Sequence, residues 1–213
     1  MKQFFALDMP AVHFVRNTLI ISVIGLVPFL ILYIFLIPGF AAHLAGGGPA
    51  LARFVRQVLT NGVPVVFAVN YAGFFLYAWM NARRPGGQSR VLFLLTDLPL
   101  RVILFIVLHA IIYVFSADWF GSFGGSRLTA LRVVAPTLAR SALFENLSGV
   151  YLYATLVSAL PLYVAVLQSS DAPRLSRRLP GRIGAVLTAI VLFGSFTLAL
   201  TVVATLIVWL QSA

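Results

Sequence analysis

Residues Val91–Ser116 have the sequence VLFLLTDLPLRVILFIVLHAIIYVFS, which is apolar over a membrane-crossing length and yet contains Asp97, Arg101 and His109. In the rest of the chain the ionisable residues lie between the long apolar stretches or at their edges. On a straight helix Asp97 and Arg101 lie one turn apart on the same face, and His109 lies two turns further on, beside that face. This stretch therefore predicts a membrane helix and a first candidate site.

The composition of the chain indicates that its solvent is lipid. Of its 213 residues, 61% are hydrophobic and 9% are charged, whereas a soluble domain is about 25% charged. The mean hydropathy is +1.02. Backbone in lipid must satisfy its own hydrogen bonds, which leaves helices or a closed barrel. The apolar stretches do not alternate as barrel strands do. The sequence thus predicts an all-α integral membrane protein with a single membrane domain over residues 1–213.

Five apolar stretches have about the 20-residue length that a transmembrane helix needs. They are arranged as two hairpins followed by a C-terminal helix, and the predicted spans are 17–42, 61–80, 91–116, 147–168 and 184–210. Pro28 and Pro38 interrupt the first span, as proline can in a membrane helix. Residues 1–16 are amphipathic, and we interpret them as a retained interfacial segment rather than a signal peptide.

Each hairpin connection combines a glycine-rich break with an amphipathic, arginine-bearing stretch. These stretches predict two interfacial helices on the outer side of the membrane, at 50–59 and 127–144. Arginine at such a helix reaches lipid headgroups, and tryptophan is enriched at the membrane surface. The residues expected at the interface are Arg53, Arg56, Arg127, Arg132, Arg140, Trp119 and Trp209.

The basic residues predict the orientation of the chain, whose net charge is +10. Nine of them precede the first span or follow the second and fourth spans: Lys2, Arg16, Arg83, Arg84, Arg90, Arg174, Arg177, Arg178 and Arg182. Five lie on the other side, in the two amphipathic stretches. This excess places the N-terminus in the cytoplasm and the C-terminus outside. Because the basic residues flank apolar stretches, we expect a lipid bilayer rather than nucleic acid as their partner.

Two interpretations of the charged residues in 91–116 remain open. In the first, Asp97 and Arg101 form an ion pair inside the bilayer, where an unpaired charge is costly and marks a functional candidate. In the second, Pro99 disfavours helix at Leu98, Thr96 or Asp97 caps a helix that begins there, and Arg101 extends to the membrane surface. We favour the second interpretation, and we expect Asp97 and Arg101 to contact each other.

Polar residues elsewhere in the spans extend this candidate site. Asn70 lies in the middle of the second span, where polar side chains usually link helices by hydrogen bonds. It is the partner that we expect first for Asp97, Arg101 or His109. The candidate site is therefore a polar intramembrane cluster of Asp97, Arg101, His109 and Asn70. At the start of the fourth span, Glu145-Asn146 predicts a helix cap.

Several chemistries are excluded by residues that the sequence lacks. Without cysteine there are no disulfides, thiolate metal sites or iron–sulfur clusters. No nucleophile-elbow, phosphate-loop or HExxH motif is present. The three histidines, His13, His43 and His109, are too far apart in sequence to predict a metal site. No catalytic residue and no cofactor is predicted. Bound lipids are expected, and a single haem or pigment ligand at His109 is a remote alternative.

Three classes of function compete. The favoured one is a non-catalytic subunit or scaffold of a larger membrane complex, because such a protein needs only apolar faces that recognise other subunits or copies of itself. The alternative is a small transporter or channel that uses Asp97, Arg101 and His109. The second alternative is a membrane-embedded enzyme or cofactor carrier, but the reactive groups that an enzyme needs are few. Arginine supplies 14 of the 15 basic residues, and with many Ala, Leu and Val this favours a bacterial inner membrane protein.

Overall fold

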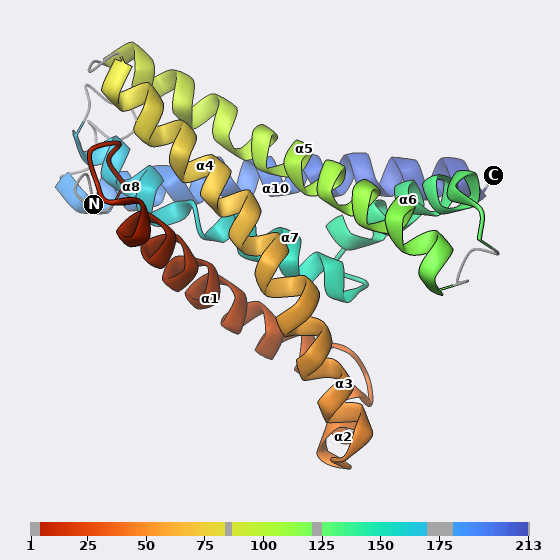
Figure 1. The fold of residues 1–213 in the computed structure, drawn as a ribbon. Coiled ribbons are helices and arrows are strands. Elements are labelled where there is room, and N and C mark those ends of the chain that lie inside the picture. The colour runs from red at the N-terminus through yellow and green to blue at the C-terminus, as the bar shows by residue number, and fades with distance from the viewer. Residues whose placement is uncertain (1–4, 84–86, 121–124, 170–180, 213) are drawn as a thin grey trace.

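The computed structural model describes residues 5–83, 87–120, 125–169 and 181–212. Within these ranges every regular element is helical (Figure 1). The elements are α1 (Ala11–Leu36), α2 (Phe40–Ala45), α3 (Pro49–Gln57), the π-helical η1 (Val58–Gly62), α4 (Val63–Arg83), α5 (Gly87–Phe120), α6 (Arg127–Ala142), α7 (Leu147–Val157), α8 (Leu160–Ser169) and α10 (Gly181–Ser212).

Five helices are long and apolar enough to cross a membrane. They are Ala11–Leu36, Pro49–Ala82, Leu92–Phe115, Leu147–Gln168 and Gly181–Gln211. The predicted all-helical class is confirmed for the described residues, and so is the presence of five membrane-length helices.

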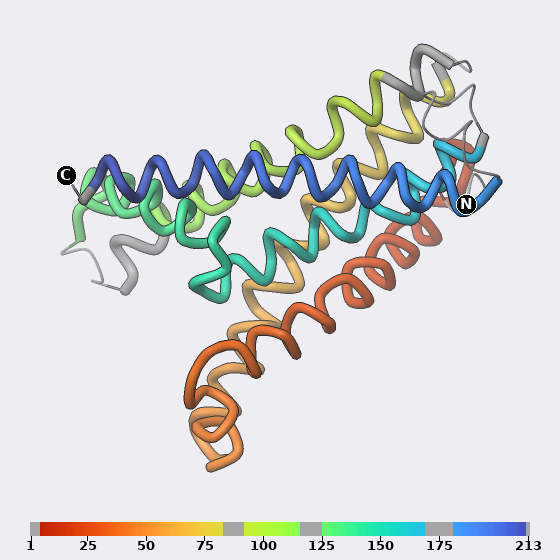
Figure 2. Tube along the Cα trace, turned by 180° about the vertical axis from the view of Figure 1, so that it is seen from behind, coloured from red at the N-terminus to blue at the C-terminus, as the bar shows by residue number. Residues whose placement is uncertain are grey.

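Helix α7 lies at the centre of the molecule. It packs against α1, α4, α5 and α6, and every residue from Gly149 to Leu156 is buried. Two arms diverge on either side of it: α1 runs beside α4, which α3 extends beyond the end of α1, while α5, α6 and α10 run in another direction (Figures 1 and 2). A helix buried on all faces must be apolar on all faces, which the composition of α7 satisfies.

The first helix begins and ends earlier than the span predicted at 17–42. Helix α1 starts at Ala11, directly after Pro10, so part of the predicted interfacial segment belongs to it. It ends at Leu36 because Ile37, which precedes a proline, is extended. Gly39 then adopts a φ of 75°, a left-handed conformation that glycine accepts without strain. Pro28 lies inside α1 as predicted.

The stretch predicted as a separate interfacial helix at 50–59 is continuous with the second span. Helix α3 continues through the π-helical turn η1 into α4, so that Pro49–Ala82 forms one helix of 34 residues. No residue of α3 is buried, and Arg53 and Arg56 are exposed. The amphipathic character predicted for this stretch is therefore present, but there is no break between the two helices.

The second stretch predicted as an interfacial helix, at 127–144, forms α6. Ser126 caps it by accepting a hydrogen bond from the Thr129 amide at 3.3 Å. The helix packs against α5, α10 and α7 and runs back along the far halves of α5 and α10 (Figures 1 and 2). It is thus part of the bundle. Asn146 caps the following helix through the Gly149 amide, 3.1 Å from its Oδ1, as predicted.

Helices α1 and α7 approach each other closely at Gly25. A Cβ built there would lie 3.1 Å from the Ala154 carbonyl oxygen, and it would clash with Ser158 Oγ. Ser158 Oγ in turn donates to the Ala154 carbonyl at 2.7 Å. The contact is therefore possible only with glycine, which lets two backbones approach as small residues do in membrane helix pairs.

We expect Gly25→Ala to lower the free energy of unfolding in detergent by about 1–3 kcal/mol, because the added methyl group separates α1 from α7. Adding Ser158→Ala should recover part of this loss by removing the clashing hydroxyl. Gly194→Ala on α10 is the matched control, since a Cβ there meets nothing within 4 Å. A loss of similar size from Gly194→Ala would mean that the α1–α7 contact is not the cause.

Candidate functional site: a buried charged cluster

Helix α5 carries Asp97 and Arg101 in its interior. The helix begins at Gly87 and contains Pro99, so Asp97 does not cap a helix that begins at Leu98. The favoured sequence interpretation of a helix cap is therefore wrong. Proline is tolerated here because it removes a single backbone donor and neighbouring helices can compensate. Tyr163 of α8 contacts this turn and donates to the Leu94 carbonyl at 3.1 Å.

Asp97 and Arg101 form a fully buried ion pair. Arg101 Nε donates to Asp97 Oδ2 at 2.9 Å, and both side chains are 0% exposed. The predicted contact between them is confirmed. Their four-residue spacing places both on one face of the helix, which is the separation at which such side chains meet.

The guanidinium of Arg101 also connects α5 with three other helices. Its Nη1 donates to Asn70 Oδ1 on α4 and to the Thr155 carbonyl on α7, the latter at 3.0 Å. Asn70 Nδ2 then donates to Ser22 Oγ on α1 at 2.9 Å. We call these five residues, Ser22, Asn70, Asp97, Arg101 and Thr155, the charged cluster. The expected pairing of Asn70 with Arg101 is confirmed.

Helix α4 provides the space that the guanidinium occupies. A Cβ built on Gly73 would lie 2.6 Å from Arg101 Cζ, so only glycine fits beside the group. The Phe74 ring lies one residue further, with its centroid 5.0 Å from Arg101 Cζ, and this distance permits a cation–π interaction. Phe5 stacks on Phe74 with ring centroids 4.2 Å apart and covers this side of the cluster.

The Thr155 carbonyl is available because helix α7 ends close to it. In an unbroken helix this oxygen would accept from the amide of Ala159. Instead the Ala159 amide donates to the Leu156 carbonyl at 3.0 Å, and α8 begins only at Leu160. Pro161 follows and has no amide hydrogen to extend the ladder. The negative end of the α7 dipole therefore faces the Arg101 cation.

This break departs from the sequence prediction, in which 147–168 is one uninterrupted span. Ser158 and Pro161 were the available signals, since proline disfavours helix at the residue before it. No side-chain pattern marks Thr155, because its backbone oxygen makes the contact. Which carbonyl would face Arg101 depends on how α7 packs against α5.

His109 is not part of the charged cluster. It lies two turns further along α5, where its Nδ1 is 3.0 Å from the Phe105 carbonyl and its ring lies 4.0 Å from the Phe105 ring, between centroids. Because a carbonyl only accepts, Nδ1 is the ring nitrogen that donates in this contact. The four residues predicted as one site thus lie at two places: Asn70, Asp97 and Arg101 belong to the charged cluster, and His109 lies apart from it on α5.

The residues predicted at the membrane interface are distributed over three helices. Arg53 and Arg56 are exposed on α3, and Arg127, Arg132 and Arg140 are exposed on α6. Trp209 is 63% exposed near the end of α10, while the side chain of Trp119 lies outside the described residues. Their contact with lipid headgroups stays a prediction. Among the described residues, no three His, Asp or Glu side chains are grouped to hold a metal ion.

The geometry of the charged cluster favours a structural rather than a reactive role for its groups. Each residue in it is buried, and its positive and negative side chains are in contact. Among the described residues, Asp97 Oδ1 and Arg101 Nη2 are the two cluster atoms without a hydrogen-bond partner. Breaking such a pair leaves a buried charge uncompensated, which costs more than removing both charges together.

The chain shows no match to a known protein family, a curated protein sequence or a solved structure. Any assignment of function must therefore rest on the geometry of the chain itself.

We expect Arg101→Leu to lower the free energy of unfolding in detergent by about 3–5 kcal/mol, because it leaves the Asp97 carboxylate buried without its partner. The double variant Asp97→Asn, Arg101→Leu should be more stable than Arg101→Leu alone. Arg140→Leu, at an exposed position, is the control and should change stability by less than about 0.5 kcal/mol. Additive effects of the two cluster substitutions would show that the two residues do not interact.

Proposed function

We propose that the protein is a multi-pass membrane protein of a bacterial inner membrane and serves as a non-catalytic subunit of a larger membrane complex. The observation that carries this proposal is the enclosure of the charged cluster. Its ion pair is 0% exposed on both sides, and its polar atoms are used to join α1, α4, α5 and α7. A cluster arranged in this way stabilises a scaffold, and its two unpaired side-chain atoms, Asp97 Oδ1 and Arg101 Nη2, are themselves buried.

The outer faces of the helices supply the surfaces that such a subunit needs. Helix α10 packs against α6 and α8 and exposes large apolar side chains along its length, among them Ile190, Leu198 and Leu206. Helix α1 exposes a second apolar face that includes Ile24 and Phe35. In a membrane, such faces contact either lipid or neighbouring helices. Two separate faces would allow the protein to connect two partners.

One observation favours a small transporter as the second candidate. The α7–α8 segment is a helix broken within a membrane-length stretch, and its carbonyl end faces a cation. Transporters use such discontinuous helices at their binding sites. A transport path also needs access to water, and the charged side chains of this cluster have no exposed surface. We therefore place transport second.

Cross-linking through a photoreactive amino acid tests the scaffold role. We expect the photoreactive amino acid, introduced in place of Leu198 or of Ile24, to form a discrete adduct with another membrane protein in the source cells. Both positions are about 65% exposed. The partner should copurify in constant ratio in mild detergent. Adducts with lipid alone at both positions would contradict the proposal. So would flux of ions or solutes through the purified protein in liposomes, lost in Arg101→Gln and retained in the exposed control Arg140→Gln.

The proposed orientation, with the N-terminus in the cytoplasm, can be tested with single cysteines because the native chain has none. We expect Ala45→Cys, at an exposed position beyond α1, to react with an impermeant maleimide in intact cells. Asp8→Cys, exposed before α1, should react only after the membrane is permeabilised. The reverse pattern would overturn the orientation. The connection around Ser176, which the sequence places in the cytoplasm, lies outside the described residues.

A further inference from the structure

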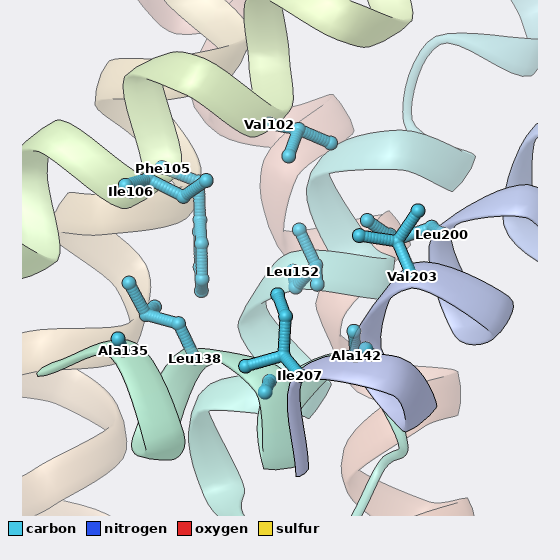
Figure 3. Close-up of a pocket in the computed structure, with 12 residues that line it drawn as sticks. Val102, Phe105, Ile106, Ala135, Leu138, Ala142, Leu152, Leu200, Val203 and Ile207 are labelled. Carbon is cyan, nitrogen blue, oxygen red and sulfur yellow. The ribbon is translucent and has the colours of Figure 1, made fainter. Parts of the chain in front are cut away.

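A cavity of about 230 Å³ lies between α5, α6, α7 and α10. Figure 3 shows side chains of α5, α6, α7 and α10 directed toward a common space. Each residue that lines the cavity is apolar. Apolar cavities of about 150 Å³ in proteins stay dry and bind small hydrophobic molecules, so this one is suited to hydrocarbon rather than to water.

The cavity has a buried floor and an exposed rim. Phe105, Leu152 and Ala204 are at most 3% exposed and form the floor. Ile106 and Val203 are 42% and 53% exposed and form the rim. The cavity therefore opens on the outer surface of the bundle. If the protein is inserted in a membrane as proposed, this opening faces the lipid chains.

Polar residues continue the cavity wall toward the C-terminal ends of α5 and α10. On α6 the cavity wall consists of Ala135, Leu138, Ala139 and Ala142, whose spacing places them on one face of the helix. Arg132 lies on the same face, one turn before Ala135. His109 stands one turn beyond Phe105 on α5, and Gln211 stands one turn beyond Ile207 on α10.

These three polar residues lie toward the same end of the arm. Helix α6 runs opposite to α5 and α10, and its first turn lies near the C-terminal end of α10 (Figures 1 and 2). A residue one turn closer to the start of α6 is therefore displaced in the same direction along the arm as a residue one turn closer to the end of α5 or α10. At this end the helices reach the membrane surface in the proposed orientation.

We propose that this cavity binds one acyl chain of an anionic phospholipid, with the phosphate held by Arg132. Arg132 is exposed, and its guanidinium makes no ion pair or hydrogen bond with other described residues. Arginine matches phosphate oxygens in geometry and charge. The site rests on the proposed membrane insertion but not on the scaffold role.

Retention of lipid in native mass spectrometry tests the site. The purified full chain is delipidated and mixed with phosphatidylglycerol or phosphatidylcholine that carry the same acyl chains. We expect one phosphatidylglycerol molecule to stay bound, with weaker retention of phosphatidylcholine. Arg132→Gln should weaken phosphatidylglycerol retention about five-fold, whereas Arg140→Gln, at an exposed position on another side of α6, should not.

Filling the cavity tests the position of the acyl chain. Ala204→Leu places extra carbon atoms in the cavity floor and should abolish retention of the lipid. Ala199→Leu makes the same change at an exposed position of α10 outside the cavity wall and is the matched control. Val203→Phe on the exposed rim is a second filling variant that does not require the core to rearrange.

Unchanged phosphatidylglycerol retention in both filling variants would overturn the proposal. So would equal retention of the two lipids that is insensitive to Arg132→Gln. Both results are independent of whether a partner protein copurifies, so failure here is distinguishable from failure of the proposed scaffold role.

Discussion

The guanidinium of Arg101 imposes the strongest constraint on this fold, because a cation inside a bundle of apolar helices must find its counter-charge and its acceptors there. Asp97 on the same helix supplies the charge, at 2.9 Å. The acceptors come from Asn70 on α4 and from the Thr155 carbonyl on α7. Three helices are thereby held at defined positions and rotations relative to one another, and Ser22 adds α1 through Asn70.

Several local irregularities of the chain follow from this constraint. Glycine at position 73 leaves room for the guanidinium beside α4. The interruption between α7 and α8 frees a carbonyl that an unbroken helix would have used. Helix α7 is buried along its length, so its free carbonyl could not be satisfied by water, and Arg101 provides the donor. Each irregularity would be unfavourable alone, and each is compensated by a contact with the cluster.

The charged cluster and His109, the two polar sites on α5, have different surroundings, which indicate different roles. The charged cluster is enclosed and joins helices, which supports a structural role. His109 lies beyond Phe105, which lines an apolar cavity open at its rim. The cavity begins beside the charged cluster, since Val102 follows Arg101 and the Leu152 carbonyl accepts from Thr155 Oγ1 at 2.7 Å. A scaffold could thus carry a bound lipid chain beside its core.

The sequence by itself determined the helical class and the presence of five membrane-length helices, because a long apolar stretch in lipid must satisfy its backbone internally. It also determined that Asp97 and Arg101 could meet, since four residues make one turn. Only the tertiary structure decided that Pro99 lies within a continuous α5, that His109 stands apart, and that α6 packs inside the bundle. A proline is compatible with the start of a helix and with its interior. An amphipathic stretch is compatible with a helix on the membrane surface and with a helix packed in a bundle. The observed structure depends on neighbouring helices, which supply acceptors for Arg101 and apolar surface for α6. These contacts join residues that are distant in sequence, so the pattern of a single stretch does not predict them.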